Sequence, residues 1–65
     1  MSDKALRATL ATLREMHRDL DAAIGAILAM PGHDQLQLAR LKKRKLLLRD
    51  EIADIEDRLI PDILA

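Results

Sequence analysis

The sequence predicts an all-α fold: an antiparallel two-helix hairpin of the coiled-coil kind, which assembles further into a helical bundle. Two apolar stripes with alternating steps of three and four residues flank a Pro-Gly turn at residues 30–34. Counted outward from this turn, the stripes mirror each other, because the residue numbers of every opposed pair add to 65. Such a mirror is typical of two helices that fold back on each other. The two stripes together form the seam between the helices. They are Leu6, Leu10, Leu13, His17, Leu20, Ile24 and Ile27, and then Leu38, Leu41, Lys45, Leu48, Ile52, Ile55 and Leu59.

The first helix is expected to span residues 3–29. Ser2 or Asp3 can cap it, because either side chain can accept a hydrogen bond from the free backbone N–H groups of the first turn. The helix has to stop near Met30, since the residue before a proline avoids helical geometry.

The second helix is expected to span residues 35–60. Asp34 is its predicted cap, and Gln37, three residues further on, would complete a capping box. A proline ends this helix and leaves a short apolar tail, residues 61–65. The tail is either frayed or folded back near Leu6, and we favour the folded-back arrangement. Residues 1–65 therefore form a single helical hairpin.

Length and composition point to self-association. A chain of 65 residues forms one small domain at most, and this one has no aromatic residues to enlarge its core and no cysteines to cross-link it. Self-association is a common remedy for a scaffold of this size, so we expect a homo-oligomer, a dimer or higher. The simplest form is a dimer with four helices.

The charge balance bears on partners and location. The chain has 11 basic and 11 acidic residues and a formal net charge of zero, which argues against general nucleic-acid or membrane binding. It has no apolar signal segment and no 18-residue apolar run, so a cytoplasmic location is expected.

Charged residues beside the stripes also favour an antiparallel register. Some of these charged residues directly follow a stripe residue, and opposed ones have numbers that add to 63. Two of the resulting pairs are attractive and one is repulsive. The pairs are Asp21 with Lys42, Arg7 with Glu56, and, repulsively, Arg14 with Arg49.

A basic stretch at residues 40–49 has two interpretations. It could bind nucleic acid or an anionic surface through Arg40, Lys42, Lys43 and Arg44. Alternatively, it is a solvated helix face whose charge is matched by aspartates of the first helix. We favour the second interpretation, because no aromatic residues interleave for base stacking and acidic residues follow in the same helix.

A candidate assembly face lies on the back of the second helix. Leu46 and Leu47 fall outside the seam, with Leu36 nearby, and adjacent leucines that face away from the core indicate a second buried face. The first helix offers small residues that a neighbouring helix could approach closely, namely Ala8, Ala11, Ala22, Gly25, Ala26 and Ala29. A second copy of the chain is the favoured partner, ahead of a different protein and of a membrane.

A polar layer interrupts the seam at His17 and Lys45. One interpretation is a network in which His17 is hydrogen-bonded to Asp21 and Lys45 reaches Asp21 or Asp19. In the other, Lys45 lays its stem over Leu20 and His17 is a satisfied core histidine. Either way, polar seam residues typically fix register and oligomeric state.

Catalysis through His17 and Asp21 is the remaining alternative. The chain has no cysteine, and no serine or threonine lies in register with His17 to act as a nucleophile. His33 is expected to be a solvent-exposed turn residue, and two distant histidines do not make a zinc site. We therefore expect a protein that is not an enzyme and has no catalytic residues, metal or cofactor.

Two motifs resemble those of the YdcH-like family, small bacterial proteins that share a domain of unknown function. They are His17-x-x-Leu20-Asp21-x-x-Ile24 and Leu41-Lys42-Lys43-x-Lys45-Leu46-x-Leu48-Arg49-Asp50-Glu51-Ile52. The resemblance covers roughly residues 10–56, with Arg49 where the family often has lysine. It implies a short helical hairpin without an established activity, and it places His17, Asp21, Lys45 and Asp50 in motif positions. Together with the patterns above, it leads us to expect a small structural or protein–protein interaction module.

Overall fold

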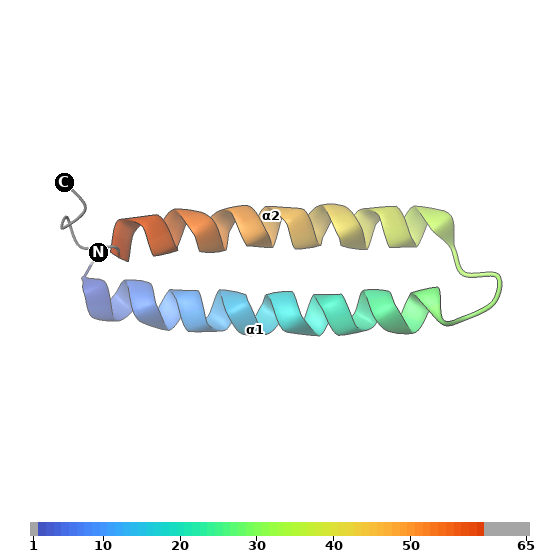
Figure 1. Ribbon diagram of the computed structural model, residues 1–65, viewed down its shortest axis with the longest axis horizontal. Coiled ribbons are helices and arrows are strands. Elements are labelled where there is room, and N and C mark those ends of the chain that lie inside the picture. Colours follow the sequence, from blue (N-terminus) through green and yellow to red (C-terminus); the bar gives the residue numbers. More distant parts are fainter. Residues whose placement is uncertain (1, 60–65) are drawn as a thin grey trace.

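The computed structural model describes residues 2–59 and shows two antiparallel α-helices joined by a short turn (Figure 1). Helix α1 spans Asp3–Leu28 and helix α2 spans Gln35–Leu59. At 1.5 Å per residue, each helix is about 37 to 39 Å long, so the hairpin is a rod. The start of α1 and the end of α2 lie at the same end of this rod, which we call the open end (Figure 1). The prediction of an all-α helical hairpin is confirmed.

The helix bounds lie close to those predicted. Helix α1 ends one residue earlier than expected, and Ala29 is its C-terminal cap residue. Ile60, the last residue of the predicted second helix, and the tail at residues 61–65 lie outside the described residues, as does the predicted contact of the tail with Leu6.

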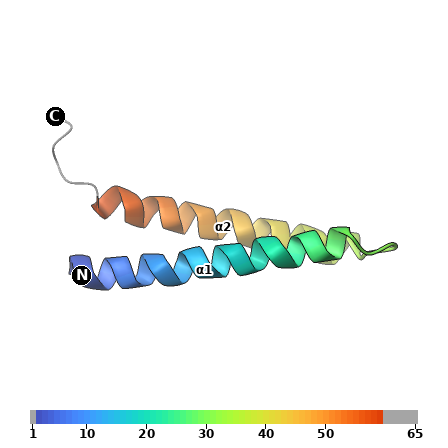
Figure 2. The same ribbon diagram turned by 60° about the horizontal axis from the view of Figure 1, so that its bottom comes forward.

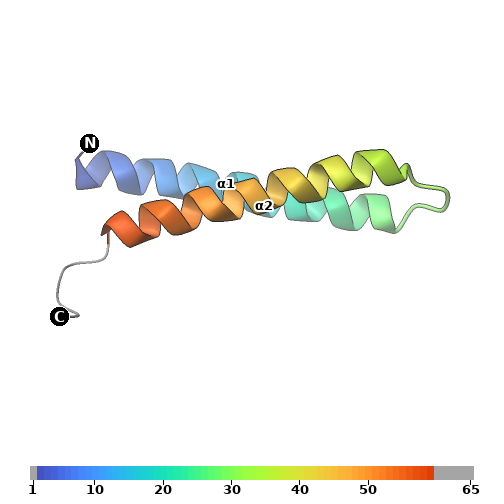
Figure 3. The ribbon, with the colours of Figure 1, turned by 90° about the horizontal axis from the view of Figure 1, so that it is seen from above.

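The two helices cross at a shallow angle, as the views in Figures 2 and 3 show. Side chains spaced three and four residues apart form ridges on a helix surface, and interlocking such ridges tilts two helices by roughly 20°. The alternating steps of the two stripes thus account for the crossing.

Both predicted N-terminal caps form. The Ser2 side chain accepts a hydrogen bond from the backbone N–H of Ala5 at 3.2 Å. At the start of α2, Asp34 Oδ1 accepts a hydrogen bond from the N–H of Leu36 at 2.9 Å. A capping box would need the Asp34 side chain to accept from the N–H of Gln37 and the Gln37 side chain to bond back, and neither bond is present within residues 2–59. The Asp34 cap was therefore predicted correctly, whereas the capping box was wrong.

The turn between the helices depends on Gly32 and His33. Gly32 has a φ of 69°, a left-handed conformation that favours glycine. His33 was predicted to be exposed, but it is half-buried. Its Nδ1 lies 3.2 Å from the carbonyl oxygen of Met30, and its Nε2 lies 3.2 Å from Nε2 of Gln35. One neutral tautomer, with its hydrogen on Nδ1, satisfies both contacts.

The core lies along the predicted seam. Every residue of the two stripes is buried or half-buried. Seven side chains are buried, namely Leu6, Leu10, Leu13, Ile24, Leu38, Leu48 and Ile55. No large side chain within residues 2–59 is fully buried, because each helix has only one neighbour.

Most of the core is one apolar cluster that begins at the open end. It contains five of the buried side chains, and Leu20, Ile52 and Leu59 extend it. Ile24 and Leu38, near the turn, are buried but do not belong to that cluster. The half-buried His17 and Lys45 lie opposite Leu48 and Leu20, so the cluster reaches into the polar layer.

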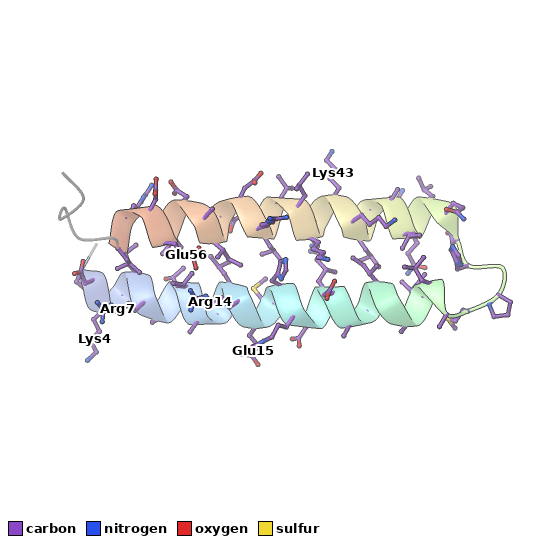
Figure 4. All side chains as sticks on the ribbon, viewed as in Figure 1. Lys4, Arg7, Arg14, Glu15, Lys43 and Glu56 are labelled. Carbon is purple, nitrogen blue, oxygen red and sulfur yellow. The ribbon has the colours of Figure 1, made fainter. Side chains whose placement is uncertain are left out.

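Ion pairs form beside the seam, but the predicted partners were wrong. Glu56 pairs with Arg14 at 2.6 Å rather than with Arg7, and Asp21 pairs with Lys45 rather than with Lys42. Side chains lean toward the N-terminus of their own helix. In an antiparallel pair, Arg14 therefore leans toward the open end and Glu56 toward the turn, so they meet although their backbones are offset. Figure 4 shows these two side chains pointing toward one another.

Candidate functional site

The polar layer contains one ion pair between the helices. Lys45 Nζ donates a hydrogen bond to Asp21 Oδ1 at 2.5 Å, as one of the two interpretations of this layer predicted. This hydrogen bond and the positive charge of Lys45 hold the pKa of Asp21 below its ordinary value of 3.8. Both side chains are partly exposed, so water screens the pair and its main effect is to set the register.

His17 is the unsatisfied member of this layer. Its Nε2 is buried and has no hydrogen-bonding partner within residues 2–59. The predicted hydrogen bond from His17 to Asp21 is absent from the described residues. The alternative interpretation, in which His17 is a core histidine with its hydrogen bonds satisfied, is also wrong. A buried polar atom without a partner costs about 1 to 3 kcal/mol, so such atoms are rare and call for a physical explanation.

A shallow groove runs beside the polar layer between the two helices. Five cationic side chains and His17 line it, whereas Glu56 is its one carboxylate. The cations are Arg14, Arg18, Lys42, Lys45 and Arg49, and the apolar lining is Leu46, Ile52 and Ala53. Arg14 and Lys45 are engaged in the two ion pairs between the helices, whereas Arg18, Lys42 and Arg49 form no salt bridge within residues 2–59. We call this feature the cationic groove.

The cationic groove is not among the features predicted from the sequence. Arg14 and Arg49 were expected to form a repulsive pair, and the basic stretch was expected to be a property of one helix. The available signal was the spacing: Arg14 and Arg18 follow the seam on the same side of α1, and Lys42 and Arg49 are one heptad apart on α2. In an antiparallel pair these positions border one groove.

The predicted assembly face consists of two surfaces. Leu36, Leu46 and Leu47 are all exposed, at 60%, 58% and 53%. Leu46 borders the cationic groove, whereas Leu47 borders a second, smaller depression. Adjacent residues on a helix point about 100° apart, so two consecutive leucines flank the outer face of α2 and do not share one side of it.

The predicted basic patch is likewise divided. Arg40, Lys43 and Arg44 surround Leu47 at the smaller depression, whereas Lys42 lines the cationic groove. All four side chains are exposed. Figure 4 shows Lys43 pointing away from α1, on the outside of the hairpin.

No group of three or more histidine, aspartate or glutamate side chains within residues 2–59 is arranged to hold a metal ion. A search of the same residues found no helix with the length and apolar character needed to cross a membrane.

Fold and surfaces together define a short antiparallel helical hairpin with a polar layer in its seam and apolar residues exposed on α2. The chain belongs to the family described as "Protein of unknown function (DUF465)", which matches residues 10–56. The match confirms the resemblance to the YdcH-like family and includes the polar layer, the cationic groove and both exposed leucines of residues 46–47. No curated protein and no solved structure matches the chain.

Proposed function

We propose that this protein is a non-catalytic interaction module whose hairpins associate with one another through α2. The observation that carries this proposal is the exposure of Leu36, Leu46 and Leu47 on a helix whose opposite side already packs on α1. Large apolar side chains that flank the outer face of one helix on both sides indicate that this face is covered by a partner.

The thin core supports the same proposal. No large side chain within residues 2–59 is fully buried, whereas several large apolar side chains are at least half exposed. A single hydrophobic core rarely supplies more than about 3 to 5 kcal/mol in a chain of this size. A second copy packed on α2 would bury leucines that the hairpin alone leaves in water, and each fully buried leucine contributes roughly 1.5 to 3 kcal/mol.

Light scattering over a wide range of protein concentrations, with helicity measured by circular dichroism in parallel, tests this function. We expect an oligomer that dissociates on dilution. Changing Leu46 and Leu47 together to glutamate should abolish the oligomer. The control is Leu28→Glu, which places the same charge at a residue of α1 that is 49% exposed. A wild-type protein that stays monomeric at all concentrations, or a double variant that associates as the wild type does, would contradict the proposal.

A second candidate function is the binding of nucleic acid or another anionic surface through residues 40–49. The cationic groove favours it, because three of its cations form no salt bridge within residues 2–59. Fluorescence titration of a labelled DNA duplex tests this function. Binding should weaken steeply between about 50 and 200 mM salt. It should also weaken in Lys42→Glu, which lies both in residues 40–49 and in the groove, but not in Lys4→Glu at the open end. Affinity that is insensitive to salt, or that is equal in both variants, would exclude this function.

A further inference from the structure

The exposed surface of α2 changes sign along its length. Arg40, Lys43 and Arg44 lie before the two exposed leucines, and none of the three forms a salt bridge within residues 2–59. The acidic residues after the leucines are exposed as well, namely Asp50, Glu51, Asp54 and Asp57. Of these four, Asp54 forms the one described salt bridge, at 3.1 Å to Arg58 in the same helix. The helix thus presents a basic half, an apolar centre and an acidic half.

The order of charges along α2 matters for a partner more than for the helix itself. The helix dipole favours acidic residues at the N-terminal end and basic residues at the C-terminal end, and its effect falls off within the first and last turns. Asp34 caps the first turn of α2, and Arg58 in the last turn offsets the acidic residues there. The charges between these ends have few partners within residues 2–59, and a partner helix with the opposite order of charges would pair with them.

A second copy of α2 carries that opposite order when it runs antiparallel. We propose that two hairpins pair α2 against antiparallel α2, across a two-fold axis that passes between Leu46 and Leu47. This arrangement rests on the proposed self-association and specifies its geometry.

The proposed axis fixes which residues face each other. Facing residues have numbers that add to 93, so Leu46 of one copy lies against Leu47 of the other. Lys43 then faces Asp50 of the other copy, and Arg40 lies within one residue of the position that faces Asp54. A parallel pairing would instead bring Lys43 against Lys43 and repel.

Surface shape agrees with this placement. The smaller depression on α2 has Leu41 and Leu47 in its lining, and its basic lining residues are Arg40, Lys43 and Arg44. A leucine of the second copy fits the apolar part, and the acidic residues that flank it reach the basic part. An acidic helix from another protein would match only the basic half and would leave the acidic half of α2 unpaired.

Exchange of charge between the halves tests the pairing. An acidic variant carries Arg40→Glu, Lys43→Glu and Arg44→Glu, and a basic variant carries Asp50→Lys, Glu51→Lys and Asp54→Lys. We expect each variant alone to self-associate about tenfold or more weakly than the wild type, and an equimolar mixture to form a heterodimer. Sedimentation measures both the self-association of each variant and the formation of the heterodimer. Variants that each associate as the wild type does, or a mixture that stays monomeric, would overturn the antiparallel pairing.

Cysteine cross-linking tests the same geometry without altering the fold or the charge pattern as a whole. The chain has no cysteine, so each introduced thiol is unique. Mixed under mild oxidation, Lys43→Cys and Asp50→Cys chains should give the mixed disulfide. Homodisulfides of Lys43→Cys should be scarce, because the two backbones would lie about 10 Å apart along the helices, beyond the reach of a disulfide. Glu15→Cys, which points away from α2 in Figure 4, is the control.

These outcomes separate the two proposals. A monomeric wild-type protein would overturn both. An oligomeric wild-type protein that gives Lys43→Cys homodisulfides, or no cross-link between positions 43 and 50, would overturn the antiparallel pairing and leave self-association standing.

Discussion

Replacement of His17 by leucine should stabilise the hairpin, although it removes a motif residue. Nε2 of His17 is buried without a partner, and such an atom costs about 1 to 3 kcal/mol of folding free energy. Leucine has no polar atom to desolvate and suits a seam position between Leu13 and Leu20. We therefore expect the free energy of unfolding to rise by about 1 to 3 kcal/mol.

Urea denaturation followed by circular dichroism measures this change. His33→Leu is the matched control, because both ring nitrogens of His33 have partners in the turn and their loss should lower stability. A His17→Leu variant less stable than the wild type would refute the reasoning, because Nε2 would then have a partner in solution. Such a partner could be supplied by a second copy or a ligand in the cationic groove.

Three further predictions concern the core, the ion pair and the glycines. Leu13→Ala should cost about 2 to 3 kcal/mol in urea denaturation, the low end for a buried leucine, since its cavity lies close to solvent. The lowered pKa of Asp21 stabilises the fold fully above pH 3.8, and that contribution is lost as the pH falls through the lowered value. Thermal midpoints against pH should therefore drop less steeply in acid for Asp21→Asn. Gly32→Ala should lower the free energy of unfolding by about 1 to 2 kcal/mol, and with it the thermal midpoint, because φ is 69° there. Gly25→Ala should raise the free energy of unfolding by about 0.5 to 1 kcal/mol, because a Cβ there meets no atom within 4 Å.

The fold could be predicted in detail because its determinants are local and periodic. The spacing of apolar residues along the sequence predicts the seam, and the Pro-Gly turn fixes which residues of the two helices face each other. Caps depend on a few neighbouring residues, which is why Ser2 and Asp34 were identified correctly. The capping box was wrong, since Asp34 accepts from the N–H of Leu36 instead of Gln37, and Gln37 forms no bond back to Asp34 within residues 2–59.

The surfaces could be predicted only in part, because they depend on the direction in which each side chain leaves its helix. Arg14 was assigned to the wrong partner because register counting ignores the lean of side chains along a helix. Leu46 and Leu47 were assigned to one face because adjacency in sequence does not convey the turn of about 100° between them. His17 Nε2 lacks a partner because of its burial and its local geometry together, and the spacing of residues in the sequence does not predict either.

The rod shape of the hairpin has a consequence for the proposed pair. Asp3 and Leu59 lie at the same end of the rod, and the turn lies about 39 Å away. In the antiparallel pairing that we propose, Leu59 lies about 19 Å from the two-fold axis along α2, which places the open ends of the two copies about 38 Å apart and facing opposite ways. Each end of the pair would thus combine the open end of one copy with the turn of the other.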